Sequence, residues 1–253
     1  MFDIPADAWG HLRGIQPLSL CDWPGRPCAV LFLGGCNLRC PTCHNFGLAW
    51  EPETLPVLYK PDVLNFLSRR AGWLEGVTVS GGEPTAVPHL ADFLRDIRAA
   101  GMPVKLDSNG MRPEIIAEVL AAGLVEEVHV DVKGPWAKYP ALTGRHATAE
   151  EAEERLSRIF DLARSRPGVF TFRCTRVPLL DDDDIAAVRA CLPAGHVLTI
   201  NAYVPPRRSH AQPDPEKRRV PGDVVHGPHR ERHPQGPEGQ RDQGPASRQA
   251  PRP

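Results

Sequence analysis

The sequence predicts an α/β fold, an open barrel of six parallel βα units, over residues 1–205. Two observations predict it. Short apolar runs alternate with longer stretches in which apolar residues recur every three or four positions. The run at residues 29–33 is wholly apolar, but within the five later runs apolar and polar residues alternate, so each of those strands has one face of each kind. The apolar faces must pack on the surrounding helices, and the polar faces therefore line the inside of the barrel.

The expected elements follow the chain in order. Apolar stripes with helical spacing separate most of the strands, and the acidic run at residues 181–184 is expected to begin the last helix, because carboxylates are stabilised at helix N-termini. Six strands, in place of the eight of a closed barrel, leave one side open, where a loop of another protein can enter. The expected strands are residues 29–33, 77–80, 104–107, 128–133, 170–177 and 197–203. The stripes are Leu90/Phe93/Leu94/Ile97, Ile115/Ile116/Val119/Leu120, Leu156/Ile159/Phe160/Ala163 and Ile185/Val188/Leu192.

The polar strand faces carry charges that are costly to bury. Asp107, Asp131, Lys133 and Arg173 are all expected to point into the barrel. Without partners each costs several kcal/mol, so they either pair with one another or hold a zwitterionic guest. We favour the guest, although Asp131 and Lys133 can form a structural pair and Arg173 can pair with an aspartate. Parallel barrels place such sites at the carboxyl ends of the strands, where Gly81, Gly82, Ser108, Asn109 and Lys133 also fall.

Three cysteines, Cys36, Cys40 and Cys43, share one short loop directly after the first expected strand. A cubane iron-sulfur cluster is held by thiolates, and three cysteines on four irons leave one iron open to a further ligand. A zinc site usually needs four ligands, and His44 directly follows Cys43, so the two are poorly placed to share one tetrahedral ion. A disulfide framework is typical of short secreted chains, whereas this chain has 253 residues and no apolar signal segment at its start.

The remaining cysteines are not predicted to bind metal. Cys174 lies on the helix-facing side of its strand, and Cys191 lies beside the apolar stripe of the last helix. Both are expected to be small buried hydrophobic residues. Cys21 and Cys28 receive no role. With no second cysteine-rich insert, the chain is expected to hold one cluster.

The cysteine loop and three later segments resemble the motifs of the radical S-adenosylmethionine (SAM) superfamily. Residues 81–84 resemble the GGEP motif of this superfamily, and residues 107–110 resemble its third-strand motif. Residues 131–133 resemble the DxK motif of the glycyl-radical-enzyme activases. Within the superfamily, residues 14–25 and 35–45 are most similar to activating proteins of anaerobic ribonucleoside-triphosphate reductase. The resemblance covers about residues 10 to 204. One departure is Thr42, where the superfamily often has an aromatic residue that stacks near the adenine.

The resemblance implies a barrel of the radical SAM type with two cofactors, one 4Fe-4S cluster and SAM. The cluster would be held by Cys36, Cys40 and Cys43, and the segment Gly81-Gly82-Glu83-Pro84 would receive the amino group of SAM. The ribose, the methionine carboxylate or a monovalent cation would be held by Asp107, Ser108, Asn109, Asp131 and Lys133. Arg173 shares the same face and can bind the carboxylate through two hydrogen bonds. No protein acid or base is required, because the cofactor carries the chemistry.

The implied function is that of an activase, which cleaves SAM reductively and generates a glycyl radical on anaerobic ribonucleotide reductase. Its partners would be this glycyl radical enzyme and an electron donor of the flavodoxin or ferredoxin type. Three alternatives remain: a small-molecule radical SAM enzyme such as one of the deazapurine pathway, the activase of another glycyl radical enzyme, and a non-catalytic iron-sulfur or zinc module that binds its partner through a basic tail.

The amino-acid composition limits the expected location of the protein and the partners it can bind. No segment is long and apolar enough to cross a membrane, so a cytoplasmic protein is expected. Residues 1–205 have a formal charge near −5, which argues against nucleic acid as the main partner. Residues 206–253 contain ten Pro and no Leu, Ile, Met, Cys or aromatic residue, so a disordered tail is expected. An out-of-frame end of the gene would also give such a composition.

Overall fold

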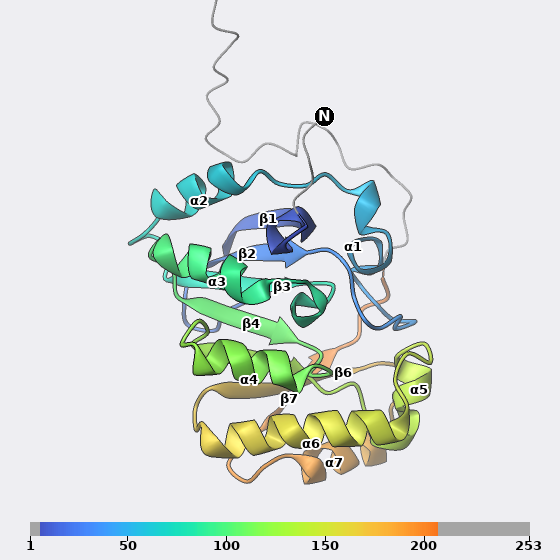
Figure 1. The fold of residues 1–253 in the computed structure, drawn as a ribbon. Helices are drawn as coiled ribbons and strands as arrows, with labels where there is room; N and C mark the ends of the chain where they lie inside the picture. Colours follow the sequence, from blue (N-terminus) through green and yellow to red (C-terminus); the bar gives the residue numbers. More distant parts are fainter. Residues whose placement is uncertain (1–5, 207–253) are drawn as a thin grey trace, which may run out of the picture. The chain divides into compact units, whose positions relative to one another are not determined.

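The computed structural model describes residues 6–206 and contains one curved sheet of seven strands in the order β1-β2-β3-β4-β5-β6-β7 (Figure 1). Strands β2 to β7 are parallel, and β1 pairs antiparallel with β2. The α/β fold and all six expected strands are therefore confirmed. The tail expected from residue 206 lies outside the described residues, apart from Pro206. The strands are β1 (Leu12–Ser19), β2 (Cys28–Leu33), β3 (Gly76–Gly81), β4 (Val104–Ser108), β5 (Glu127–Asp131), β6 (Phe170–Arg176) and β7 (Leu198–Ala202).

The antiparallel strand β1 was not predicted, and its irregular pairing explains why. Its register with β2 shifts between Leu12 and Gly14 and again between Gln16 and Ser19. Apolar residues consequently fall three apart, at Leu12, Ile15 and Leu18, and the period of two that marks a strand is lost. This strand lies at one edge of the sheet, and β7 lies at the other, so the barrel is open between them.

The helices lie on the outer face of the sheet (Figure 1). The four predicted stripes fall on α3, α4, α6 and α7, while three shorter or less regular helices were not predicted. Residue Leu192 lies just beyond α7 as its C-cap. The helices are α1 (Phe46–Trp50), α2 (Lys60–Ser68), α3 (Leu90–Ala99), α4 (Pro113–Ala121), α5 (Tyr139–Leu142), α6 (Ala149–Ser165) and α7 (Asp182–Cys191). Four 3-10 turns add η1 (Ala8–His11), η2 (Pro52–Thr54), η3 (Pro84–Ala86) and η4 (Trp136–Lys138).

The expected start of the last helix is confirmed. The side chain of Asp181 accepts from the Asp184 backbone N–H, and the Asp184 side chain accepts in return from the Asp181 N–H. This capping box satisfies two backbone donors that a helix start otherwise leaves unpaired. Helix α6 begins with the same arrangement at Thr148 and Glu151.

The outer strand faces form the core with these helices, as the alternation predicts. The rings of Phe160 on α6 and Phe172 on β6 meet edge to face, with centroids 5.3 Å apart. Gly110 lies so close to the Leu156 side chain that an added Cβ would come within 2.6 Å of it. Helix α6 is therefore packed directly on β6 and on the loop that follows β4.

The inner face is apolar along β2 and polar along the next four strands. The buried indole of Trp23 packs with Cys28 and Val30, which gives Cys28 the role of a core residue. The Trp23 indole N–H also donates to Glu127 across the sheet, at 2.7 Å. Gly76 lies against the same ring, where a Cβ would come within 2.6 Å of it. Trp23 therefore fills the inner face near the amino ends of the strands.

Two of the other cysteines can now be compared with prediction. Cys174 is buried, as predicted. The prediction for Cys191 is wrong, because it is exposed. Helix α7 buries Ile185 and Val188, and at 100° per residue Cys191 lies about 120° around the helix from Ile185. It is also the last helical residue, where the stripe has left the sheet. Cys21 is exposed.

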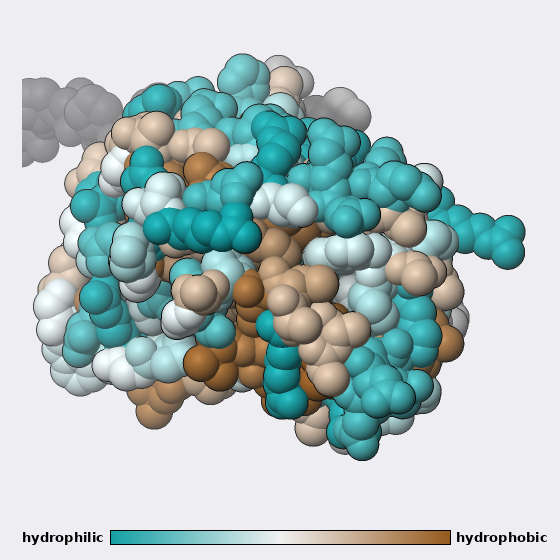
Figure 2. Space-filling model, turned by 90° about the horizontal axis from the view of Figure 1, so that it is seen from below, coloured by the Kyte–Doolittle hydropathy of each residue, from teal (hydrophilic) through white to brown (hydrophobic). Residues whose placement is uncertain are grey.

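Scattered apolar side chains lie on the surface of the described residues. Seen from below the first view, hydrophilic side chains surround an apolar area near the middle of the face (Figure 2). The most exposed large apolar residues are Trp73, Val197 and Leu20, at 89%, 80% and 73%. Within residues 6–206, no helix combines the length and apolar character needed to cross a membrane.

Candidate functional site

The predicted site residues meet at the carboxyl ends of β2 to β6. They line a cavity of about 220 Å³. Each comes from the loop or strand end that the sequence indicated. Pro84 alone of the predicted residues does not line the cavity, because it is buried at the start of η3. The predicted residues in the cavity wall are Cys36, Cys40, Cys43, Gly81, Gly82, Glu83, Asp107, Ser108, Asn109, Asp131, Lys133 and Arg173.

The cysteine loop is held in shape by backbone hydrogen bonds. The Cys43 N–H donates to the Cys40 carbonyl at 3.0 Å, which closes a turn between the second and third cysteines. The Arg39 N–H donates to Thr143 at 3.2 Å and ties the loop to the end of α5. The Arg39 guanidinium donates to the Cys36 carbonyl at 2.7 Å. These hydrogen bonds fix the backbone that carries the three cysteines.

The thiols themselves are partly buried, and this affects their ionisation. Burial raises the pKa of Cys36 to about 12 and also raises the pKa of Cys40 and of Cys43. Metal ligation requires thiolates, so iron binding would release protons here. The Leu38 N–H already points at the Cys36 sulfur, at 3.4 Å, as is common for sulfur ligands of clusters.

The described side chains do not form the compact group of ligands that a single metal ion needs. Among the described residues, no three His, Cys, Asp or Glu side chains are close enough to bind one metal ion. A tetrahedral zinc site needs such a group. The cysteines of a cubane each bind a different iron and therefore stand further apart. The His44 ring, the proposed fourth zinc ligand, contacts the Val204 carbonyl.

Gly81 and Gly82 lie where the end of β3 meets the backbone that leads into the cysteine loop. The Gly82 N–H donates to Leu33 and the Glu83 N–H donates to Gly35, each at 2.8 Å. A Cβ at Gly81 would lie 2.2 Å from the Leu33 carbonyl oxygen, and one at Gly82 would lie 2.0 Å from that of Gly35. The two glycines are therefore needed so that the end of β3 can approach the backbone that leads into the cysteine loop.

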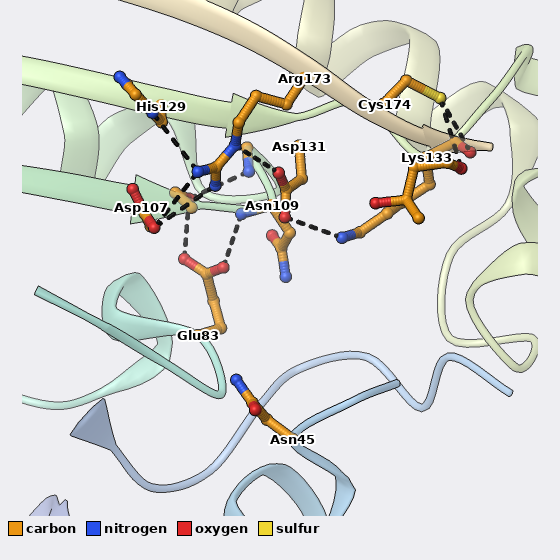
Figure 3. Close-up of polar contacts among 12 residues, drawn as sticks. Asn45, Glu83, Asp107, Asn109, His129, Asp131, Lys133, Arg173 and Cys174 are labelled. Atoms are coloured by element: carbon orange, nitrogen blue, oxygen red, sulfur yellow. Dashed lines mark hydrogen bonds and ion pairs between the residues drawn. The ribbon is translucent and has the colours of Figure 1, made fainter. Parts of the chain in front are cut away.

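Glu83 is 1% exposed, and its carboxylate accepts four hydrogen bonds. Three reach one oxygen, from the Thr85 N–H at 3.2 Å, the Thr85 hydroxyl at 2.5 Å and the Ser108 hydroxyl at 2.8 Å. The Asn109 N–H donates to the other oxygen at 2.7 Å (Figure 3). Burial raises the pKa of Glu83, and these donors oppose that effect. Glu83 thus joins the ends of β3 and β4, and its contact with an ammonium group stays a prediction.

The charged residues on the inner face pair with one another (Figure 3). The Arg173 Nε donates to Asp131 at 3.0 Å, and its NH2 lies 3.4 Å from Asp107. Lys133 donates to Asp131 at 3.2 Å. Burial opposes the charged form of Asp131, yet Lys133 and Arg173 together lower its pKa to about 2. Both structural pairs that the sequence left open are therefore present, and a guest is not needed to explain why these charges are tolerated.

Sequence reasoning gave no role to two further residues of this network. Lys105 is fully buried and pairs with Asp107, and His129 is 4% exposed and contacts Arg173. The alternation of residues along β4 and β5 had placed both side chains on the inner face, so the sequence did indicate that they face inward. Asp107 lies two residues from Lys105 on the same strand, whereas Arg173 lies on β6, far from His129 in sequence, and that contact cannot be read from spacing.

Comparison with known families decides the class of the protein. Residues 30–191 match the model of the Radical SAM superfamily. This chain is a radical SAM protein. Enzymes of this superfamily use a 4Fe-4S cluster and SAM, and these are the cofactors of the chain.

This radical SAM protein is similar to two relatives over part of their lengths. One, from Methanocaldococcus jannaschii, is named a glycyl-radical enzyme activating enzyme; it is 32% identical over 202 residues, which are 77% of this chain and 80% of that protein. The other is the pyruvate formate-lyase-activating enzyme of Clostridium pasteurianum, 31% identical over 144 residues, which are 54% of this chain and 58% of that enzyme.

A solved structure was also matched. The crystal structure of Streptococcus suis SuiB bound to S-adenosylmethionine matches with 16% identity and a TM-score of 0.49, over 67% of this chain and 39% of that one.

Proposed function

We propose that this radical SAM enzyme is an activase that generates a glycyl radical on a glycyl radical enzyme, with anaerobic ribonucleoside-triphosphate reductase as its target. One observation carries the proposal: the three cysteines and the Asp131-Val132-Lys133 segment line the same cavity. The first is the ligand set of a cluster with an open iron, and the second resembles the DxK motif of the activases. The name of the M. jannaschii relative supports the same class of reaction.

The first proposed role in this reaction is that of the three cysteines, as ligands of the cluster. Cys36, Cys40 and Cys43 would hold the cluster. When bound and reduced, it would supply the one electron needed to cleave the sulfur–C5′ bond of SAM into methionine and a 5′-deoxyadenosyl group that takes one hydrogen atom from a glycine Cα of the partner, giving 5′-deoxyadenosine and the glycyl radical.

Lys133 and Arg173 are proposed to bind the methionine carboxylate of SAM. An ammonium group has three donors, and Lys133 uses one of them on Asp131. Asp131 keeps both cations charged and close to the cavity, which favours an anionic group beside them. The segment 81–84 is proposed to receive the amino group, and Ser108 and Asn109 to line the ribose side.

The partner glycine is proposed to enter through the open side of the barrel, between the sheet edges formed by β1 and β7. The choice of ribonucleotide reductase rests on residues 14–25 and 35–45. Pyruvate formate-lyase is the second candidate target, because a relative that activates it is 31% identical. The electron donor is proposed to be a flavodoxin or ferredoxin, and the setting to be the cytoplasm.

The test is an anaerobic assay in two steps. Reconstituted protein with dithionite and SAM should release 5′-deoxyadenosine and methionine. Addition of a candidate glycyl radical enzyme should then produce the doublet of a glycyl radical in the electron paramagnetic resonance (EPR) spectrum. Cleavage of SAM without any radical on either candidate target would contradict the assignment of the target. Absence of SAM cleavage, with the cluster intact, would contradict the activase reaction itself.

A further inference from the structure

A continuous chain of polar side chains runs along the inner face from Trp23 to the cavity. Glu127 on β5 accepts from Trp23 at 2.7 Å, and the His129 Nε2 lies 2.5 Å from the same carboxylate. The His129 Nδ1 lies 3.4 Å from the Arg173 NH1. Arg173 in turn contacts Asp131 (Figure 3). None of the cluster or SAM motifs includes Glu127 or His129.

We propose that His129 is a positioning residue for SAM binding, whose neutral ring donates through Nε2 to Glu127 and accepts at Nδ1 from Arg173, and so fixes the guanidinium at the floor of the cavity. This inference rests on the proposed binding of SAM at Arg173. It adds a residue that never touches SAM and acts through another side chain.

The hydrogen-bond partners determine which tautomer of His129 is present. Glu127 is a carboxylate and only accepts, so the Nε2 atom beside it must carry the hydrogen. Arg173 only donates, so the Nδ1 atom beside it must be the unprotonated one. A neutral ring satisfies both partners at once, and the opposite tautomer satisfies neither.

The surrounding charges keep the ring neutral. Lys105 and Asp107 face it from β4, Glu127 and Asp131 lie on its own strand, and Arg173 faces it from β6. Burial, followed by the nearby Lys105, lowers the pKa of His129, and the contact with Glu127 opposes this. A second proton on Nδ1 would place a positive charge directly against the Arg173 guanidinium.

The register of the sheet explains why this contact is useful. Asp107 and His129 are neighbours across β4 and β5, and Asp131 and Arg173 are neighbours across β5 and β6. The guanidinium therefore has the Asp131 carboxylate at Nε, the Asp107 carboxylate beside NH1 and NH2, and the imidazole at NH1. Partners on three sides leave the group a single orientation, which lowers the entropy cost of binding a carboxylate.

Two substitutions test the contacts of the two ring nitrogens of His129 one at a time. His129→Asn keeps an acceptor near the Nδ1 position and loses the contact with Glu127, whereas His129→Gln can place its NH2 near the Nε2 position and loses the acceptor for Arg173. SAM affinity is measured by equilibrium binding to the reconstituted, oxidised full-length protein. Loss of one such hydrogen bond predicts about tenfold weaker binding for His129→Gln, and binding within about threefold of wild type for His129→Asn. Thr78→Val, a buried inner-face change whose hydroxyl contacts the Cys28 thiol, should leave the affinity unchanged.

A second measurement reads the tautomer directly. In the wild-type protein with ¹⁵N-labelled histidine, the ring nitrogens of His129, assigned by their absence in a variant, should show a protonated Nε2 and an unprotonated Nδ1. Equal affinities of the Asn and Gln variants, or a protonated Nδ1 in the wild type, would overturn the inference. If wild-type protein with a full cluster binds no SAM, the proposed function fails while the tautomer result still stands or falls by itself. If the variants do not fold, the wild-type spectrum decides.

Discussion

The substitution Glu83→Gln tests whether this carboxylate positions the backbone or serves SAM alone. One oxygen of Glu83 accepts three hydrogen bonds and the other accepts one, from the Asn109 N–H. A glutamine can keep its oxygen at the first position only by turning its NH2 toward Asn109. Two donors then face each other in a site that excludes water, and the backbone donor is left without an acceptor.

The expected magnitude follows from these contacts. A hydrogen bond to a charged group contributes about 1.5–3 kcal/mol, and an unsatisfied buried donor costs about 1–3 kcal/mol. Glutamine is neutral and avoids the burial penalty that raises the pKa of Glu83, which offsets part of the loss. We therefore expect the free energy of unfolding to fall by about 2–3 kcal/mol.

The assay is urea unfolding of the full-length, cluster-free protein under anaerobic conditions, compared with wild type. Glu118→Gln, an exposed change of the same chemistry on α4, is the matched control and should shift the free energy by less than about 0.5 kcal/mol. An unchanged free energy of unfolding in Glu83→Gln, together with weaker SAM binding, would refute the positioning role and support a direct contact with SAM.

Three further predictions concern the cofactors and the tail. Cys40→Ala should abolish the cluster, whereas Cys191→Ala, at an exposed position, should retain about four irons and four sulfides per chain; equal iron contents would contradict the ligand assignment. Asp131→Ala and Lys133→Ala should keep the cluster and weaken SAM binding by about 1.5–3 kcal/mol, because each removes a charge-assisted contact at the cavity; unchanged affinities in both would leave only their structural pairing. Truncation after Pro205 should preserve cluster binding and dithionite-driven SAM cleavage, because residues 206–253 supply no cysteine; a large drop in cleavage would show that the tail belongs to the working site.

The strands could be predicted where the pattern of apolar and polar residues follows from how the strand is packed. Strands β3 to β7 pack one face on helices and turn a polar face inward, so a period of two is enforced along each, whereas β2 is apolar on both faces and is marked by its continuous apolar run. Strand β1 has two register shifts and lies at an edge, so its sequence is under no such constraint. The predicted burial of Cys191 was wrong because the angle of a residue around the axis of α7 determines whether it is buried. Nearness in sequence to buried residues of the helix does not determine it.

The membership of the site was also predictable, but the role of each residue was less so. Motif residues follow strand ends, and parallel strands bring their carboxyl ends together. Which partner each side chain finds depends on strands far apart in the chain. Glu83 reaches donors 25 and 26 residues away, and the two glycines meet the backbone of Leu33 and Gly35. Spacing within one segment carries no information on these contacts.

The charge pattern at the cavity floor connects the fold with its proposed ligand. Lys105, Lys133 and Arg173 are three cations that share two carboxylates, Asp107 and Asp131. Glu83 is occupied by its own neutral donors, and Glu127 is held by Trp23 and His129 on the side away from Lys133. This group of five charges therefore has one positive charge in excess, on side chains that line or adjoin the cavity. The methionine carboxylate of SAM would carry the opposite charge, so the ion pairs that hold these side chains in place also leave the cavity floor attractive to an anionic group.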